Sequence, residues 1–176
     1  MRIYVARHGQ TQWNVEDKVC GRTDLPLTEE GQRQAQILCD RIGERNIDLI
    51  IASPMLRARQ TAAPAAEKYG IPMIVDSRLI EQDYGIYEGV SRFDEGFLSN
   101  KRQFAYRYPG GESMMDVAHR VYALLEEIRQ KHEGKNVLLV CHGGVCRVIR
   151  TYFEDMTNEE YFHYSEENAA VREYVL

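Results

Sequence analysis

The sequence lacks the positive charge that a nucleic-acid or anionic-membrane surface requires. Its 22 Lys and Arg residues are outnumbered by 27 Asp and Glu residues, which gives a net charge of −5. Proteins that bind nucleic acids or anionic membranes present a basic face to them. We therefore expect neither partner, although a few arginines gathered in one cleft could still attract a small anionic substrate.

Membrane, export and metal signals are also missing. No apolar run approaches the roughly 20 residues needed to span a bilayer, and the opening MRIYVARHG does not have the layout of a signal peptide. We therefore expect a cytoplasmic protein. The four cysteines form no C-x-x-C pair, and no His, Asp or Glu spacing indicates a metal site. We expect free thiols, no metal and no cofactor.

Strand-like and helix-like patterns alternate along the chain. Apolar or alternating segments predict strands at residues 2–6, 48–53, 71–76, 136–141 and 171–176. Helical patterns follow Thr28 and Pro54, and Pro64 should kink or end the second of these helices. This order predicts an α/β fold with a mostly parallel sheet. No repeat, low-complexity tract or linker interrupts it, so we expect one domain over residues 1–176.

Reactive side chains follow three of the predicted strands. Arg7-His8-Gly9 ends the first, Ser53-Pro54 follows the second ahead of Arg57, and His142-Gly143-Gly144 follows the fourth. Ligands of such sheets gather at the carboxyl ends of the strands. These three segments therefore predict one common site.

The segment VCHGGVCR, residues 140–147, has the strand, glycine turn and helix of a phosphate cradle. A cysteine phosphatase needs a thiolate, backbone N–H groups and an arginine in such a loop, and Cys141 and Arg147 have that spacing. However, Val148 stands where low-molecular-weight tyrosine phosphatases usually have Ser or Thr, and the chain has no Asp-Pro acid. We interpret Cys141 as a buried strand residue and keep cysteine catalysis as a remote alternative.

A series of motifs carries a different resemblance. The segment RHGQTQWN at residues 7–14 resembles the Arg-His-Gly signature of the histidine phosphatase superfamily, also called the phosphoglycerate mutase-like family. Five further segments resemble motifs of this family and stand in the family's order. They are GRTDLPLTEEG at 21–31, SPMLRARQTA at 53–62, LIEQDYGIYEG at 79–89, PGGES at 109–113 and HGG at 142–144. The resemblance, from residue 2 to about 150, implies a three-layer α/β/α fold with a short helical cap at roughly 90–111.

The resemblance also implies a mechanism without metal. His8 would attack phosphorus through a neutral imidazole and become a phosphohistidine, with its other ring nitrogen held by a carbonyl. Glu81 would protonate the leaving alkoxide, which requires burial or the phosphate to raise its pKa. Asp83 and Glu88 are nearby alternatives to Glu81 as the general acid. The structural interpretation of Asp83 is a solvated charge on the loop, and that of Glu88 is a residue of the Tyr-Glu-Gly turn.

A shell of phosphate and substrate contacts is implied around His8. Arg7 and Arg57 would bind phosphate oxygens, and His142 would donate to the phosphoryl group beside the Gly143 N–H. The same set includes Thr11, Asn14, Gly21, Arg22 and Arg59, of which Arg59 should turn away from the face of Arg57. Arg22 replaces the Trp that mutases of the family usually carry, which favours a phosphatase. The histidines His119, His132 and His163 are expected to be structural.

The length of the cap distinguishes the family's activities. Mutases carry a long insertion here, whereas only about twenty residues separate Gly89 from Gly110. We therefore expect a phosphomonoester hydrolase for a small phosphorylated metabolite, with mutase-type transfer as the alternative. A non-catalytic phospho-ligand binder is a third, remote possibility. Lys101, Arg102 and Arg107 could hold an anionic tail of the substrate, and the sheet edge could pair two chains into a homodimer.

Overall fold

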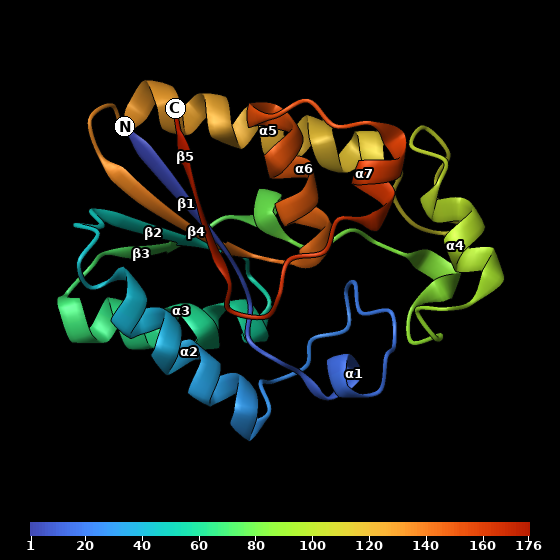
Figure 1. The fold of residues 1–176 in the computed structure, drawn as a ribbon, viewed down its shortest axis with the longest axis horizontal. Helices are drawn as coiled ribbons and strands as arrows, with labels where there is room; N and C mark the ends of the chain where they lie inside the picture. The colour runs from blue at the N-terminus through green and yellow to red at the C-terminus, as the bar shows by residue number, and fades with distance from the viewer.

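A five-stranded sheet forms the centre of the computed structural model, which describes residues 1–176 (Figure 1). Its order is β3-β2-β4-β1-β5, with three parallel pairs and β5 antiparallel to β1 at one edge. The strands are β1 (Arg2–Arg7), β2 (Leu49–Ala52), β3 (Met73–Val75), β4 (Asn136–Cys141) and β5 (Val171–Val175). The predicted, mostly parallel α/β sheet is confirmed.

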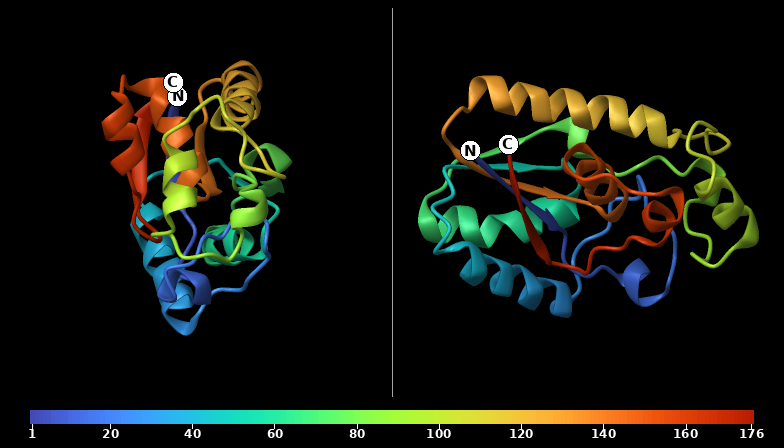
Figure 2. Two further views of the ribbon diagram at one scale, coloured as in Figure 1. Left: turned by 90° about the vertical axis from the view of Figure 1, so that its right-hand side faces the viewer. Right: turned by 45° about the horizontal axis from the view of Figure 1, so that its top comes forward.

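Helices cover both faces of this sheet (Figures 1 and 2). One layer holds α2 (Glu29–Ile42) and α3 (Leu56–Tyr69), and the other holds α5 (Met114–Lys131) and α6 (Gly143–Phe153). The shorter helices are α1 (Gln12–Val15), α4 (Glu95–Lys101) and α7 (Asn158–His163), with 3₁₀ turns at Ser77–Leu79 and Gly85–Tyr87. The chain thus has the three layers that the motifs imply.

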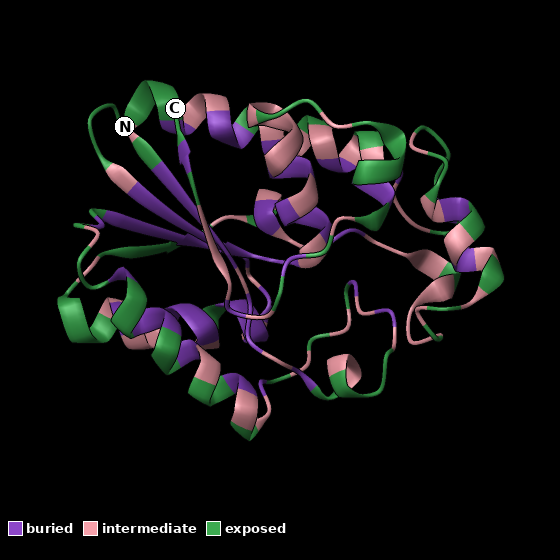
Figure 3. Ribbon diagram, in the orientation of Figure 1, coloured by how far each residue is buried: buried purple, intermediate pink, exposed green.

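The two-residue period of the central strands builds a core on each face. In β1, Ile3 and Val5 pack with α5 and α6, while Tyr4 and Ala6 pack with α2 and α3. Both faces of β1, β2 and β4 are therefore buried, as Figure 3 shows, which explains their near-continuous apolar sequences. In β4 the same alternation directs Cys141 into the core beneath α5 and α6.

Local signals place the helix starts more reliably than the helix ends. Thr28 caps α2 by accepting a hydrogen bond from the Gly31 N–H, as expected. Of the two outcomes predicted for Pro64, a kink or an end of the helix, the end is wrong, because α3 continues through it to Tyr69. The buried face formed by Ala58, Ala62 and Ala65 holds the helix on both sides of the proline.

The carboxyl ends of β1, β2 and β4 meet at one end of the sheet. The segment with α4 and the loop with α1 lie beyond that end, whereas the two chain termini lie at the other (Figure 1). No helix in the structure combines the length and the apolar character required to cross a bilayer. The sheet therefore brings the three motif-bearing strand ends to one place, facing the 90–111 segment.

Candidate active site

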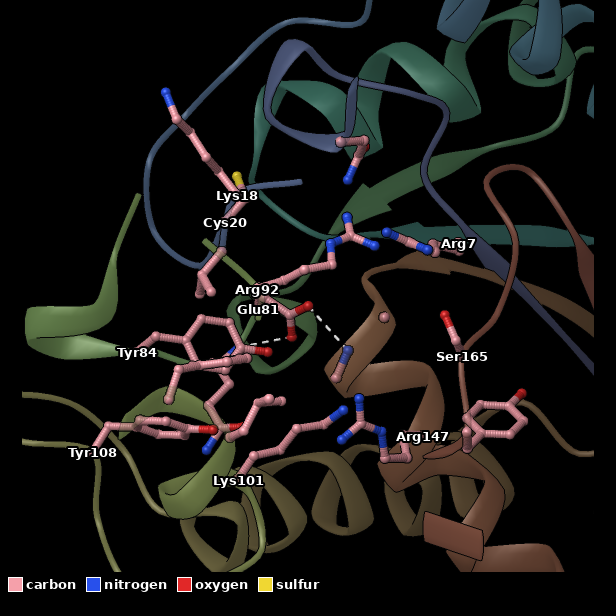
Figure 4. Close-up of a pocket in the computed structure, with 18 of the residues that line it drawn as sticks. Arg7, Lys18, Cys20, Glu81, Tyr84, Arg92, Lys101, Tyr108, Arg147 and Ser165 are labelled. Carbon is pink, nitrogen blue, oxygen red and sulfur yellow. Dashed lines mark hydrogen bonds between the residues drawn. The ribbon is translucent and has the colours of Figure 1, made fainter. Parts of the chain in front are cut away.

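A cavity of about 310 Å³ opens at this end of the sheet. Residues from β1, the 81–84 loop, α4 and the start of α6 line it (Figure 4). Of the residues proposed from the sequence, it contains Arg7, His8, Asn14, Glu81, Lys101 and Gly143. The remaining ones lie behind the wall or outside the cavity.

His8 follows directly on β1 and is fixed by the sheet. Its backbone N–H donates to the Cys141 carbonyl at 2.9 Å, and its side chain is buried. The ring Nδ1 lies 2.7 Å from the Gly9 carbonyl oxygen. Since a carbonyl can only accept, Nδ1 carries the proton and Nε2 keeps its lone pair. Burial, and then the charges of Arg57 and Arg7, hold the pKa of His8 well below its usual range. The imidazole is therefore neutral at pH 7.

Arg7 supplies positive charge beside this imidazole. Its Nη1 donates to the Glu166 carbonyl at 2.6 Å, and its buried Nε has no partner in the protein. The guanidinium lies against the start of α6, since a Cβ added to Gly143 would be 3.6 Å from the Arg7 Nε. A buried donor without an acceptor costs free energy, so this Nε is suited to an anion in the cavity.

Asn14 is oriented so that its amide nitrogen can donate. Its Oδ1 accepts from the Thr11 N–H at 2.9 Å, from the Thr11 hydroxyl at 3.1 Å and from Asn168 at 3.4 Å. The Nδ2 group is left to face the cavity that Asn14 lines. Thr11 is fully buried and does not line the cavity, so it orients Asn14 and is not placed to contact phosphate itself.

Arg57 and His142 lie behind the cavity wall, which differs from the expectation of direct phosphate contacts. Both are fully buried, and neither lines the cavity. Arg57 donates through Nε to His142 Nδ1 at 3.2 Å and through its other nitrogens to the Thr23 and Gly21 carbonyls, each at 2.8 Å. The three Arg57 nitrogens thus all donate to acceptors within the protein.

The Arg57 contact also determines the tautomer of His142. Because arginine can only donate, Nδ1 accepts and Nε2 carries the proton, which it shares with the Ser53 hydroxyl at 2.7 Å. The His142 ring centroid is 5.1 Å from that of His8. Burial, followed by Arg57 and His8, keeps the pKa of His142 well below its usual range. The two imidazoles thus form a neutral buried pair.

Glu81 is the one acidic side chain that lines the cavity. It is only 5% exposed, and its Oε1 accepts from the Gln82 N–H at 2.9 Å while its Oε2 accepts from the Gly144 N–H at 3.0 Å (Figure 4). The carboxyl group is therefore held at the first turn of α6.

The two acids considered beside Glu81 have structural contacts instead. Asp83 Oδ1 accepts from the Gly85 N–H at 2.9 Å in its own turn. The Glu88 carboxylate accepts from three successive backbone N–H groups, of Gly21, Arg22 and Thr23. Neither acid lines the main cavity, so Glu81 is the acid placed to meet a substrate.

Three proposed substrate contacts lie outside the main cavity. Gly21 is part of the turn held by Glu88, and Arg22 pairs with Glu112 at 3.1 Å. The Arg22 Nε also donates to the Glu81 carbonyl at 3.0 Å, so this arginine supports the loop of the acid. Arg59 is exposed and donates to the Pro54 carbonyl at 3.1 Å. As its spacing indicates, it turns away from the site.

Cys141 does not line the cavity. Its Sγ is buried 3.5 Å from that of Cys146, and burial together with this contact raises the pKa of the Cys141 thiol well above its usual range. A reactive cysteine needs the opposite, an accessible group with a lowered pKa. The geometry therefore disfavours the cysteine mechanism. No group of three or more His, Cys, Asp or Glu side chains is placed to hold a metal ion.

Residues outside the predicted catalytic and phosphate-binding set also line the cavity. Its further positive charges come from Lys18, Arg92, Lys101 and Arg147. The further aromatic and uncharged polar side chains include Gln82, Tyr84, Phe93, Phe97, Tyr108, His163, Tyr164 and Ser165. The expectation that His163 is purely structural did not anticipate its place in the wall. No sequence motif marks residues 163–165, because the chain after α6 returns to the site only through the tertiary fold.

Comparison with known proteins places this geometry in a family. Residues 3–176 match the model described as the histidine phosphatase superfamily, branch 1. A probable phosphoglycerate mutase, GpmB of Escherichia coli O1:K1, is 39% identical over 150 residues, covering 81% of this chain and 70% of the relative. Mycobacterial glucosyl-3-phosphoglycerate phosphatase with VO3 gives a TM-score of 0.88 at 30% identity, covering 98% and 91% of the two chains. Bacillus stearothermophilus YhfR gives 0.88 at 29%, covering 98% and 89%.

Proposed function

The chain belongs to the histidine phosphatase superfamily, and we propose that it is a phosphomonoesterase that passes the phosphoryl group through His8 to water. The observation that carries this proposal is the state of His8. It is a neutral imidazole whose Nδ1 proton is bound to a carbonyl, so that Nε2 is free to attack in a cation-rich cavity. Such an attack divides one slow displacement into two steps.

In the first step, Nε2 of His8 forms a bond to phosphorus while the bond from phosphorus to the leaving oxygen breaks. Arg7, the Asn14 amide and the N-terminus of α6 surround the transferring group with donors. Glu81, entering as the carboxylic acid, gives its proton to the leaving oxygen, and the alcohol departs. The products are phosphohistidine, alcohol and the Glu81 carboxylate.

In the second step, water replaces the alcohol. Glu81 takes one proton from the water as its oxygen bonds to phosphorus, and the bond from phosphorus to Nε2 breaks. Inorganic phosphate leaves, and both His8 and Glu81 return to their starting states. The buried His142 and Arg57 would hold the site in shape and keep His8 neutral.

The 90–111 segment supports hydrolysis of a small substrate. Arg92, Phe97 and Lys101 from this segment line the cavity opposite His8, so we propose that it caps the site. Its one helix, α4, is seven residues long. A cap of this size encloses a small metabolite and leaves room for water.

Transfer to a second substrate is the alternative. The probable mutase among the relatives and the extra cations of the cavity favour it. Both proposals share phosphohistidine, so the acceptor distinguishes them. With labelled 3-phosphoglycerate and 2,3-bisphosphoglycerate, release of free phosphate would support hydrolysis, whereas interconversion without release would overturn it in favour of a mutase.

A direct test uses p-nitrophenyl phosphate with EDTA present. We expect turnover in the wild type and none in His8→Ala. We also expect an acid-labile, base-stable phosphoryl label on the wild-type protein after rapid quenching. Activity that survives His8→Ala, or that requires a divalent metal, would overturn the proposal.

A further inference from the structure

The turn between α7 and β5 brings the end of the chain back to the loop that follows β1 (Figure 1). The Glu166 carbonyl accepts from Arg7 Nη1 at 2.6 Å, and the Ala169 N–H donates to the Arg7 carbonyl at 3.0 Å. The side-chain amide of Asn168 donates to the His8 carbonyl at 2.9 Å. A segment 160 residues further along the chain thus holds the loop that carries the proposed nucleophile.

The backbone of this turn has a conformation that most residues avoid. Ala169 has a φ of 56°, in the left-handed region, and its side chain is buried. Such a conformation is unfavourable for a residue with a Cβ, and it persists where the surrounding contacts fix it, most often at functional sites. Here those contacts are the carbonyls of Arg7 and His8, which bind the Ala169 N–H and the Asn168 amide.

Asn168 is the one donor that the protein supplies to the His8 carbonyl. His8 is buried, so its carbonyl depends on this amide for a hydrogen bond. The next N–H along the chain, of Gly9, donates to the Thr61 hydroxyl at 2.9 Å. The peptide group between His8 and Gly9 is therefore held at its oxygen by Asn168 and at its nitrogen by Thr61.

This peptide group affects the tautomer of the nucleophile. The carbonyl that accepts the Nδ1 proton of His8 belongs to Gly9, in the following peptide group. Because peptide groups are planar, a rotation of the first group about the His8 Cα would carry the Gly9 carbonyl with it. Asn168 can thus act on the imidazole through the backbone, without contacting the ring.

The second proton of the Asn168 amide is directed at Asn14. The Asn168 nitrogen lies 3.4 Å from Asn14 Oδ1, which also accepts from the N–H and the hydroxyl of Thr11. An amide nitrogen carries two protons, so Asn168 can donate to His8 and to Asn14 at the same time. These donors occupy Oδ1 and leave the Nδ2 group of Asn14 for the cavity, where phosphate oxygens need donors.

We propose that Asn168 is a positioning residue for the reaction, whose single amide group fixes both the backbone of the nucleophile and the side chain of Asn14. This role rests on the proposed phosphomonoesterase function of His8 and deepens it. Asn168 does not line the cavity, so it acts through its two partners and does not contact the substrate. Loss of the amide would release both groups at once.

The variant Asn168→Ala tests this role by kinetics. We expect kcat for p-nitrophenyl phosphate to fall by roughly 10–10²-fold, as for a small misplacement of reacting groups, with a smaller change in KM. The Glu81 carboxylate is held by the Gln82 and Gly144 N–H groups and does not contact Asn168, so alkyl phosphates should show the same loss. A loss that is equal for good and poor leaving groups distinguishes this role from a displacement of the acid.

Asn136 provides a matched control at the start of β4, the end of that strand away from the cavity. Its amide nitrogen also donates to two oxygens, the carbonyls of Arg45 and Asn46, each at 3.2 Å. Asn136→Ala therefore removes a comparable bridging amide from the fold. We expect a lower urea midpoint in both variants, and a loss of kcat only in Asn168→Ala.

The variant Asn168→Asp separates hydrogen-bond donation from the filling of space. A carboxylate has nearly the same size and shape as the amide, but at neutral pH it has no proton to give to the two oxygens. If Asn168 acts as a donor, Asn168→Asp should lose at least as much kcat as Asn168→Ala. Wild-type kcat in Asn168→Asp would overturn the proposed role.

Nitrogen-15 NMR of the histidines reports the state of the nucleophile without turnover. The shifts of Nδ1 and Nε2 differ between the two neutral tautomers, and the signals that disappear in His8→Asn identify His8. We expect a single tautomer with the proton on Nδ1 in the wild type and in Asn136→Ala. In Asn168→Ala the two shifts should approach each other, because both tautomers become populated.

The two measurements distinguish the positioning role from the phosphomonoesterase. A wild type that hydrolyses no phosphomonoester, but whose His8 tautomer depends on Asn168, would overturn the phosphomonoesterase and retain the positioning role. A single Nδ1–H tautomer in Asn168→Ala would overturn the positioning role. So would an unchanged kcat in that variant, or an equal loss of kcat in Asn136→Ala.

Discussion

The Oε2 oxygen of Glu81 accepts a hydrogen bond from the Gly144 N–H at 3.0 Å, which ties the proposed acid to the first turn of α6. The contact leaves no space for a larger residue. A Cβ added to Gly144 would lie 2.6 Å from Glu81 Oε1 and 3.1 Å from the Tyr84 hydroxyl. The glycine therefore sets the position of the acid, and the adjacent Gly143 has no such contact.

Gly144→Ala should displace Glu81 and impair protonation of the leaving group. We expect kcat for alkyl phosphates to fall by about 10²-fold, as for loss of a general acid, with a smaller loss for p-nitrophenyl phosphate. Its nitrophenolate leaves without a proton. The measurement is a plot of rate against leaving-group pKa, and Glu81→Gln should steepen it in the same way.

Gly143→Ala is the matched comparison at the neighbouring residue. The nearest atom to its added Cβ would be Arg7 Nε at 3.6 Å, an ordinary contact, and Glu81 would stay in place. Any loss in this variant should therefore be the same for good and poor leaving groups. Equal leaving-group dependence in the two alanine variants would show that Gly144 does not position the acid.

The buried histidine pair should make the protein less stable as the pH falls below 6.5. His8 and His142 both have strongly lowered pKa values in the folded state, whereas the unfolded chain protonates them near 6.5. The unfolded state then binds more protons, so stability is complete above that pH and is lost below it. The expected slope is about 1.4 kcal/mol per pH unit for each histidine.

Urea unfolding between pH 7.5 and 5 measures this slope. The window lies above the range in which the carboxylates titrate, so the histidines dominate it. His8→Asn should remove about half of the dependence, provided that it unfolds as one cooperative transition. A free energy of unfolding that stays constant from pH 7.5 to 5 would contradict the neutral, buried pair.

The local features of this chain could be read from its sequence because they depend on nearby residues. The capping Thr28, the apolar strands and the order of the motifs each follow from short segments. The contacts of Arg57 could not be read in this way, because its three acceptors, on Gly21, Thr23 and His142, lie far from it along the chain. The motif alone does not show that Arg57 contacts His142.

The charged residues of the cap show even more clearly that tertiary contacts cannot be predicted from the sequence alone. Lys101, Arg102 and Arg107 look equivalent in the sequence, yet only Lys101 lines the cavity, since α7 and α5 supply acids to the other two. The sequence marks Arg147 only by its spacing from Cys141. Its place in the cavity wall and its unpaired, buried Nε depend on the tertiary fold.

Cys141→Ser should leave turnover nearly intact and reduce stability instead. The thiol lies in the apolar core against Cys146, outside the cavity. Replacing it with a hydroxyl buries a polar group with a poor partner, which costs about 1–3 kcal/mol. We expect unchanged kcat and KM for p-nitrophenyl phosphate and an earlier urea midpoint. Loss of kcat in folded protein would return the cysteine mechanism to consideration.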